Sequence, residues 1–146
     1  MTALDLSAWM GRIARRRVAR ESSRGSGVAR VNLLRASAFE LPFVGSSFDN
    51  LVSTFPTEYI FESKSLGEAW RVMRPGSRWV IIPIAQLAPR GVWHRLSAKL
   101  FEVTGQAPDW DGPLAGCLRS SGFRVHQQIL SLPQSHVHVT VATKPE

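Results

Sequence analysis

The pattern of apolar and polar residues predicts strands and helices in alternation along the chain. Six stretches carry either a short apolar run or the apolar–polar alternation of a half-buried strand. They are residues 3–6, 28–36, 49–55, 77–85, 123–130 and 136–143. The fourth stretch has apolar residues in succession, which is typical of a strand in a parallel sheet whose two faces are both covered.

Helices are predicted between these strands. The first starts at Ser7, a suitable N-cap, and stops at the Gly- and Ser-rich stretch 21–27. The second starts with a capping box formed by Ser65 and Glu68 and ends at residues 75–76, Pro-Gly. Two more helices are expected at 91–105 and 114–122, on either side of a loop at 106–113. This alternation predicts an α/β fold with a mostly parallel sheet.

Length and composition indicate a single domain spanning residues 1–146. The mean hydropathy of −0.06 is that of a soluble globular protein, and no apolar run reaches the ~20 residues of a membrane span. The N-terminal residues place their charge after the apolar positions, unlike a signal peptide, so a cytoplasmic protein is expected. The single cysteine, Cys117, excludes an internal disulfide and a cysteine-based metal site.

The positive charge of the chain is concentrated near its N-terminus. Residues 1–35 hold eight Arg against Asp5 and Glu21, a net charge of +6, whereas the remaining residues carry a net charge of +1. Such a patch can bind the phosphates of nucleic acid. On a helical wheel, however, most of these arginines lie outside an apolar arc, and no aromatic residue is interleaved with them. The pattern therefore favours a solvated helix face over a nucleic-acid site.

Three motifs follow one another in a fixed order in the first half of the chain. They are Leu-Pro-Phe at 41–43, Ser-Phe-Asp at 47–49, and Arg-Val-Met-Arg-Pro-Gly at 71–76. This order resembles the class I S-adenosylmethionine-dependent methyltransferases, in particular the methyltransferase type 11 group. The resemblance implies an incomplete Rossmann-like methyltransferase sheet with an antiparallel C-terminal strand and helices on both faces. It also implies methyl transfer to a small-molecule acceptor.

The resemblance further implies positions that bind the adenosine part of S-adenosylmethionine. In the family, an acidic residue at the end of the second strand binds the ribose hydroxyls, and Asp5, followed by Leu6, stands at that place. Met10 and Ala38 are expected on the faces of the adenine ring. Ser37 is expected at its exocyclic amine, where the family has an Asp.

Ligands of this fold class lie at the carboxyl ends of the strands. Ser53, Thr54 and Phe55 end the third predicted strand and are therefore also expected to face the cofactor. The positions expected to contact the acceptor are Pro56, Tyr59 and Trp93. No catalytic residue can be named, because methyl transfer depends mainly on aligning the reacting atoms.

The sequence departs from the family in what precedes Asp5. Family members begin with a strand and a Glu/Asp-x-Gly-x-Gly-x-Gly turn that receives the methionine part of the cofactor, and the 146 residues contain no such element. We therefore expect a domain truncated at its N-terminus, with a sheet that is either rearranged or split. A partner chain or a second copy is expected to complete a split sheet. Binding of S-adenosylmethionine by the isolated chain is expected to be weak or lost.

Two other functions stay open from the sequence alone. One is a degenerate, non-catalytic partner subunit, and the other is a nucleic-acid-binding domain that uses the arginine-rich helix. A metal site is not expected. His136 and His138 share one face of a strand, but no third ligand lies near them in the sequence.

Overall fold

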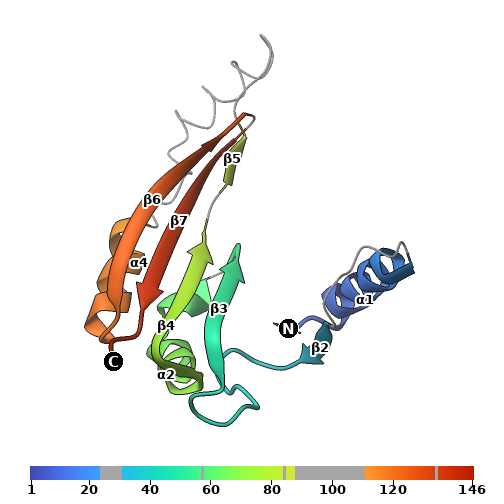
Figure 1. Ribbon diagram of the computed structural model, residues 1–146, viewed down its shortest axis with the longest axis horizontal. Coiled ribbons are helices and arrows are strands. Elements are labelled where there is room, and N and C mark those ends of the chain that lie inside the picture. The colour runs from blue at the N-terminus through green and yellow to red at the C-terminus, as the bar shows by residue number, and fades with distance from the viewer. Residues whose placement is uncertain (24–30, 57, 84, 88–110, 134) are drawn as a thin grey trace. The chain divides into compact units, whose positions relative to one another are not determined.

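The computed structural model describes residues 1–23, 31–56, 58–83, 85–87, 111–133 and 135–146. These residues form two compact units, Met1–Phe43 and Val44–Glu146. The first unit holds a two-stranded sheet and the second a five-stranded sheet (Figure 1). The described strands thus form an α/β fold with two sheets rather than one continuous sheet.

The first unit is a strand–helix–strand motif of β1 (Thr2–Asp5), α1 (Ala8–Ser23) and β2 (Asn32–Arg35). The two strands are parallel, with Asp5 opposite Arg35. Ser7 caps α1 as predicted, because its Oγ accepts a hydrogen bond from the backbone N–H of Met10 at 3.3 Å. The described side chains of this unit are half-buried or exposed.

The second unit is larger and contains most of the helices and strands. Its elements are β3 (Phe48–Thr54), the 3₁₀ helix η1 (Glu58–Phe61), α2 (Ser63–Val72), β4 (Met73–Ile82), β5 (Ala85–Leu87), α4 (Asp111–Ser120), β6 (Arg124–Leu132) and β7 (Ser135–Thr143). The strands run in the order β3-β4-β7-β6, and β5 follows β4 along the same side of β7 (Figure 1). The predicted helix at 91–105 and the residues 106–110 lie outside the described residues.

The C-terminal strand of this sheet is antiparallel, as predicted. β3 and β4 are parallel to each other, whereas β7 is antiparallel to β4, β5 and β6. Because β7 lies inside the sheet rather than at its edge, three of the four strand pairings are antiparallel. The sheet is therefore mixed: β3, β4, β5 and β6 run in one direction, and β7 alone of its described strands runs against them.

The core of the second unit lies on one face of the sheet. A row of side chains crosses four strands on this face: Leu51, Trp79, Ala142 and Val125. It belongs to the same buried cluster as helix residues from α2 and α4, namely Leu66, Ala69, Leu114 and Leu118.

The opposite face of the same sheet is open in the described part of the chain. The neighbouring row there contains Val52, Val80 and Val141, and the Val52 side chain is 68% exposed. α2 and α4 contribute to the core on the same face of this sheet, and helices on both faces stay a prediction. Val80 on this face is half-buried. It belongs to the run of consecutive apolar residues that predicted a strand covered on both faces.

The start of α2 differs from the predicted capping box. The helix begins at Ser63 after Glu62, which makes no side-chain cap. Ser65 is instead buried in the first turn, and its Oγ donates to the carbonyls of Tyr59 and Glu62. Because η1 leads the chain directly into α2, the helix starts before Ser65 can act as its cap. Glu68 pairs with Arg71 rather than with the helix start.

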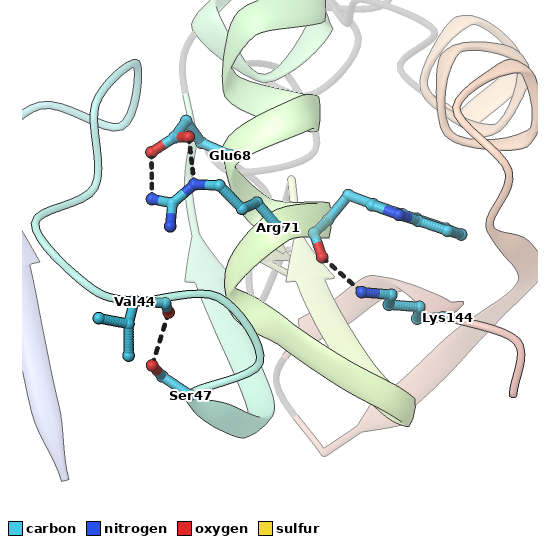
Figure 2. A network of polar contacts seen from close by, with 6 residues as sticks. Val44, Ser47, Glu68, Arg71 and Lys144 are labelled. Carbon is cyan, nitrogen blue, oxygen red and sulfur yellow. Dashed lines mark hydrogen bonds and ion pairs between the residues drawn. The ribbon is translucent and has the colours of Figure 1, made fainter.

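The end of α2 is fixed by the C-terminal tail. α2 passes directly into β4 at Met73, so the Pro-Gly pair at 75–76 lies within the strand rather than before it. Lys144 Nζ donates to the carbonyl oxygens of Trp70 and Met73, each at 2.8 Å, and Figure 2 shows one of these two bonds. These bonds satisfy acceptors that the last turn of a helix leaves free. α4 starts at Asp111, three residues before the predicted helix.

Candidate functional site

Asp5 lies at the carboxyl end of β1 and is exposed. Its Oδ1 accepts a hydrogen bond from the backbone N–H of Ser7 at 2.7 Å, which orients the carboxylate at the start of α1. The described residues give no partner to its second oxygen. Leu6 and Met10 stand beside it with exposed fractions of 63% and 44%. Asp5 can therefore still accept hydrogen bonds from a ligand hydroxyl.

Arg35 is the neighbour of Asp5 on the adjacent strand. It lies opposite Asp5 in the register of β1 and β2, and its Nε donates to the carbonyl oxygen of Leu6 at 3.0 Å. This bond ties the end of β2 to the turn that follows β1. Sequence reasoning missed Arg35, because only the register of the two strands brings it next to the predicted ribose-binding residue.

A cavity of about 270 Å³ opens beside Asp5 in the first unit. It is lined by residues from the β1–α1 turn, the first half of α1 and the end of β2: Asp5, Ser7, Ala8, Gly11, Arg12, Arg15, Leu33, Leu34 and Arg35. One aspartate and three arginines are thus among the residues that line this cavity. Arg12 and Arg15 were predicted only as part of a solvated helix face, and their i, i+3 spacing is the sequence signal that places both on one side of α1.

Ser37 and Ala38 follow the carboxyl end of β2 and are half-buried. The Oγ of Ser37 accepts a hydrogen bond from the backbone N–H of Phe39 at 3.1 Å, which closes a tight polar turn. A hydroxyl oxygen has a second lone pair and a proton, so Ser37 can still accept one further hydrogen bond and donate one. Because β1 and β2 are parallel, these residues and Asp5 share one edge of the first unit.

The three predicted residues at the end of β3 differ in their surroundings. Ser53 lies on the core face of the sheet, and its Oγ accepts a hydrogen bond from Trp79 Nε1 at 3.0 Å. Thr54 is exposed. The side chain of Phe55 is 63% exposed, and its backbone has a φ of 49°, in the left-handed region that non-glycine residues rarely adopt.

Two of the three predicted acceptor-binding residues pack inside the second unit. Pro56 is buried and Tyr59 is half-buried against the core cluster of the second unit. Trp93 lies outside the described residues. The first unit contains Asp5, Leu6, Met10, Ser37 and Ala38, whereas Ser53 to Pro56 and Tyr59 belong to the second.

The second and third sequence motifs meet in the second unit. The backbone N–H groups of Ser46 and Ser47 donate to the carbonyl oxygens of Arg71 and Val72, at 2.9 and 2.7 Å. Ser47 Oγ donates to the carbonyl oxygen of Val44 at 2.6 Å (Figure 2). These bonds hold the turn before β3 against the junction of α2 and β4, so the two motifs are coupled structurally.

Glu68 and Arg71 form a two-pronged ion pair beside this turn (Figure 2). Arg71 donates from Nε and Nη2 to the two carboxylate oxygens at 2.7 and 2.8 Å. The hydrogen bond with Glu68 raises the pKa of Arg71 above its ordinary value. The pair keeps a cation at the last turn of α2, where it interacts favourably with the helix dipole.

Among the residues that the structure describes, no three His, Cys, Asp or Glu side chains are grouped so that they could hold a metal ion. None of the helices in this part of the chain is both long and apolar enough to cross a membrane.

Comparison with known families gives one match over most of the chain. The sequence model of the ubiE/COQ5 methyltransferase family matches residues 1–125. The Ubiquinone/menaquinone biosynthesis C-methyltransferase UbiE of Geotalea daltonii is 31% identical over 111 residues, which are 72% of this chain and 45% of that protein. The Demethylmenaquinone methyltransferase of Clavibacter sepedonicus is 38% identical over 82 residues, 56% of this chain and 31% of that protein. The chain spans less than half the length of these relatives.

Solved structures resemble the chain over nearly its whole length. A SAM-dependent methyltransferase from Methanosarcina mazei is 20% identical, with a TM-score of 0.59, and the match covers 99% of this chain and 81% of that one. The Haemonchus contortus phosphoethanolamine N-methyltransferase 2, in complex with S-adenosyl-L-methionine, gives a TM-score of 0.65 at 15% identity and covers 99% and 43%. At these identities the likeness shows the fold, which agrees with the α/β class predicted from the sequence.

Proposed function

The chain belongs to the ubiE/COQ5 methyltransferase family, and from this membership we propose that it is the greater part of a methyltransferase domain that uses S-adenosylmethionine. The family match also confirms the class I resemblance of the sequence motifs. The names of the curated relatives support a further step. We propose that the acceptor is a small quinone-type ring that is methylated on carbon.

The observation that carries the proposal is the position of Asp5. Its exposed carboxylate stands at the carboxyl end of a parallel strand and is held by the Ser7 N–H, with one oxygen left for a ligand. Two vicinal ribose hydroxyls are a suitable partner for such a carboxylate, as in dinucleotide-binding folds. Met10, Ser37 and Ala38 lie in the same unit and are proposed to contact the adenine ring.

The residues of the chain would contribute to catalysis by binding and orientation. S-adenosylmethionine supplies a methyl group that is already activated by the adjacent sulfonium. The work of the protein is therefore to align the acceptor carbon with that methyl group and to exclude water. We propose that Ser53, Thr54 and Phe55 face the cofactor. We propose that Pro56, Tyr59 and Trp93 contact the acceptor.

Binding by the 146-residue polypeptide is proposed to be weak. Its sequence offers candidates for the adenosine part of the cofactor but no glycine-rich turn for the methionine part. Each missing hydrogen bond to a charged group costs about 1.5–3 kcal/mol, and ~1.4 kcal/mol is tenfold in affinity. We expect adenosine and S-adenosylmethionine to bind about equally and feebly, without methyl transfer.

Calorimetric titration of both ligands into the polypeptide tests this proposal. Asp5→Ala is expected to abolish the residual binding of both ligands, because both carry the ribose hydroxyls. Glu40→Ala removes another exposed carboxylate of the same unit and should leave binding unchanged. If Asp5→Ala binds both ligands as well as the original chain, Asp5 does not hold the ribose. If S-adenosylmethionine binds at micromolar or tighter concentrations, the site is complete and the weak-binding proposal fails.

We also propose that a second chain, or another copy of this one, pairs with β3. Within the described residues β3 pairs with β4 alone, and an edge strand can pair with a further strand. Light scattering during size-exclusion chromatography measures the mass of the particle. A dimer or larger assembly is expected, and a monomer at all concentrations would contradict the proposal.

A further inference from the structure

We propose that Phe55 is a stacking platform for a neutral, planar aromatic ring. The inference rests on the proposed function and adds to it the class of ligand and the residue that contacts it. Two independent observations carry it. The Phe55 side chain is 63% exposed, and its backbone φ of 49° lies in the left-handed region.

The backbone conformation of Phe55 is unusual for its sequence. A bulky side chain disfavours a positive φ, because Cβ comes too close to the carbonyl oxygen. Phe55 also precedes Pro56, and a residue before proline prefers the extended region. Neither Phe55 nor the following Pro56 favours a left-handed backbone, so the surrounding structure must impose this conformation.

The neighbours of Phe55 do hold this conformation. Its backbone N–H donates to the carbonyl oxygen of Ile82 at 2.8 Å, one residue beyond the Thr54–Ile82 pair of the β3–β4 ladder. The following residue, Pro56, is buried. The chain is thus anchored on both sides of a residue whose ring stays largely in water.

This arrangement is unfavourable for stability in two ways. The backbone is strained, and a large apolar ring remains exposed instead of joining the core. Strain that the surroundings enforce clusters at ligand sites. Phe55 lies at the carboxyl end of a parallel strand, which is where ligands bind in open α/β sheets. An exposed aromatic ring at that place is suited to stack on another ring.

The chemistry of the ligand follows from the side chains at this point. Phe55 and the exposed Thr54 carry no charge, so the platform favours a neutral ring, to which the Thr hydroxyl can add one hydrogen bond. Two ligands of a methyltransferase have such a ring. One is the adenine of the cofactor, and the other is an aromatic acceptor.

Binding to the full chain can be followed from the NMR shift of the Phe55 amide. The probes are adenosine, 2-naphthol, and decahydro-2-naphthol, the saturated analogue that cannot stack. The variants Phe55→Leu and Phe55→Ala remove the ring, and Phe55→Tyr keeps it. Val52→Ala is the matched control, because Val52 is an exposed apolar residue of the same strand with no left-handed backbone.

A stacking site predicts a defined order of affinities. 2-Naphthol should bind about two- to tenfold more tightly than its saturated analogue, the fold-change that corresponds to one aromatic pair. Phe55→Leu and Phe55→Ala should lose this difference, whereas Phe55→Tyr and Val52→Ala should keep it. Adenosine binding that also depends on the Phe55 ring assigns the platform to the cofactor, and its absence assigns the platform to the acceptor.

The strain gives a second and independent readout. Phe55→Gly and Phe55→Ala both remove the ring, but only glycine adopts the positive φ freely. The glycine variant should therefore melt roughly 3–6 °C above the alanine variant.

The proposal is overturned if neither aromatic probe binds, if Phe55→Leu binds 2-naphthol as tightly as the original chain, or if glycine gives no advantage over alanine. The proposed function can fail separately. Ring-dependent binding of 2-naphthol, together with adenosine binding that does not change in Asp5→Ala, would retain the platform and reject the cofactor site.

Discussion

Asp49 Oδ1 lies 2.5 Å from Arg74 Nη1, in an ion pair that joins the Ser-Phe-Asp motif to the Arg-Pro-Gly motif. Arg74 also donates from Nε to the carbonyl oxygen of Ser46 at 3.1 Å. One guanidinium group therefore contacts both the side chain and the backbone of the turn before β3. These contacts couple the two motifs structurally without any part of a cofactor.

The first prediction is that the charge of this pair contributes little to stability. The side chains of Arg74 and Asp49 are 52% and 73% exposed, and exposed ion pairs are worth ~0–1 kcal/mol. A double-mutant cycle with Arg74→Ala and Asp49→Ala should give a coupling energy in that range, falling as salt is added. Arg74→Ala should cost more than Asp49→Ala, because it also removes the bond to Ser46. Denaturant unfolding measures both, and a coupling energy above ~2 kcal/mol would contradict the expectation.

Local sequence signals predicted the elements of the fold better than their arrangement. The apolar run of β3 and the Ser7 cap of α1 depend on neighbouring residues, and both are confirmed. The place of β7 inside the sheet depends on pairings with β4 and β6, which no local pattern encodes. The capping box at Ser65 was wrong for a similar reason, because η1 supplies the start of α2 from outside the motif.

The residues of the candidate site also differ in whether their positions could be predicted from local sequence. The place of Asp5 at the end of a strand and before a capped helix could be predicted from local sequence, whereas its role at the ribose comes from the resemblance and stays a prediction. The place of Arg35 could not be predicted in this way, since its position beside Asp5 depends on the register of two strands. The conformation of Phe55 has no sequence signal at all, because a residue before proline reads as extended.

The second prediction concerns the arginines of α1. Arg12, Arg15, Arg16 and Arg17 are exposed and have no ion-pair partner among the residues that the structure describes. Binding to duplex DNA or to RNA should be weak and independent of sequence. Neutralising about four phosphates of a duplex gives a slope near −3.6 in log K against log salt.

Fluorescence anisotropy at several salt concentrations measures this slope. Arg16→Gln should reduce its magnitude by about one, whereas Arg119→Gln in α4 is the control and should not change it. A sequence-specific complex that survives ~0.5 M salt would make nucleic-acid binding the main function instead.

The third prediction is that Lys144 stabilises the second unit through the end of α2. Its ammonium group donates to two carbonyl oxygens and lies 5.0 Å from the centre of the Trp70 ring. Lys144→Met keeps the apolar stem but removes the donors and the charge, and should lower the free energy of unfolding by about 1–3 kcal/mol. Lys64→Met changes an exposed lysine in the first turn of α2 and should stay within ~0.5 kcal/mol. Equal effects of the two substitutions in denaturant unfolding would show that the bonds at Lys144 add nothing.

The fourth prediction compares the effects on stability of alanine substitutions at two glycines, one inside α4 and one in the turn after it. Gly122 has a φ of 93°, and a Cβ added there would lie 3.1 Å from Cη2 of the Trp70 ring. Gly122→Ala therefore meets both backbone strain and the indole, which also packs edge-on against Phe123 with the ring centres 4.8 Å apart. Because neither obstacle can relax without moving the core, the substitution should cost about 2–4 kcal/mol.

Gly116 is the matched control for Gly122, because it lies inside α4 and nothing stands within 4 Å of an added Cβ. Gly116→Ala should raise the free energy of unfolding by about 0.5–1 kcal/mol, since alanine loses less conformational entropy in a helix. Thermal and denaturant unfolding of the two variants should thus shift in opposite directions. If Gly122→Ala is as stable as the original chain, the turn between α4 and β6 does not need a left-handed residue, and Trp70 does not limit the space beside it.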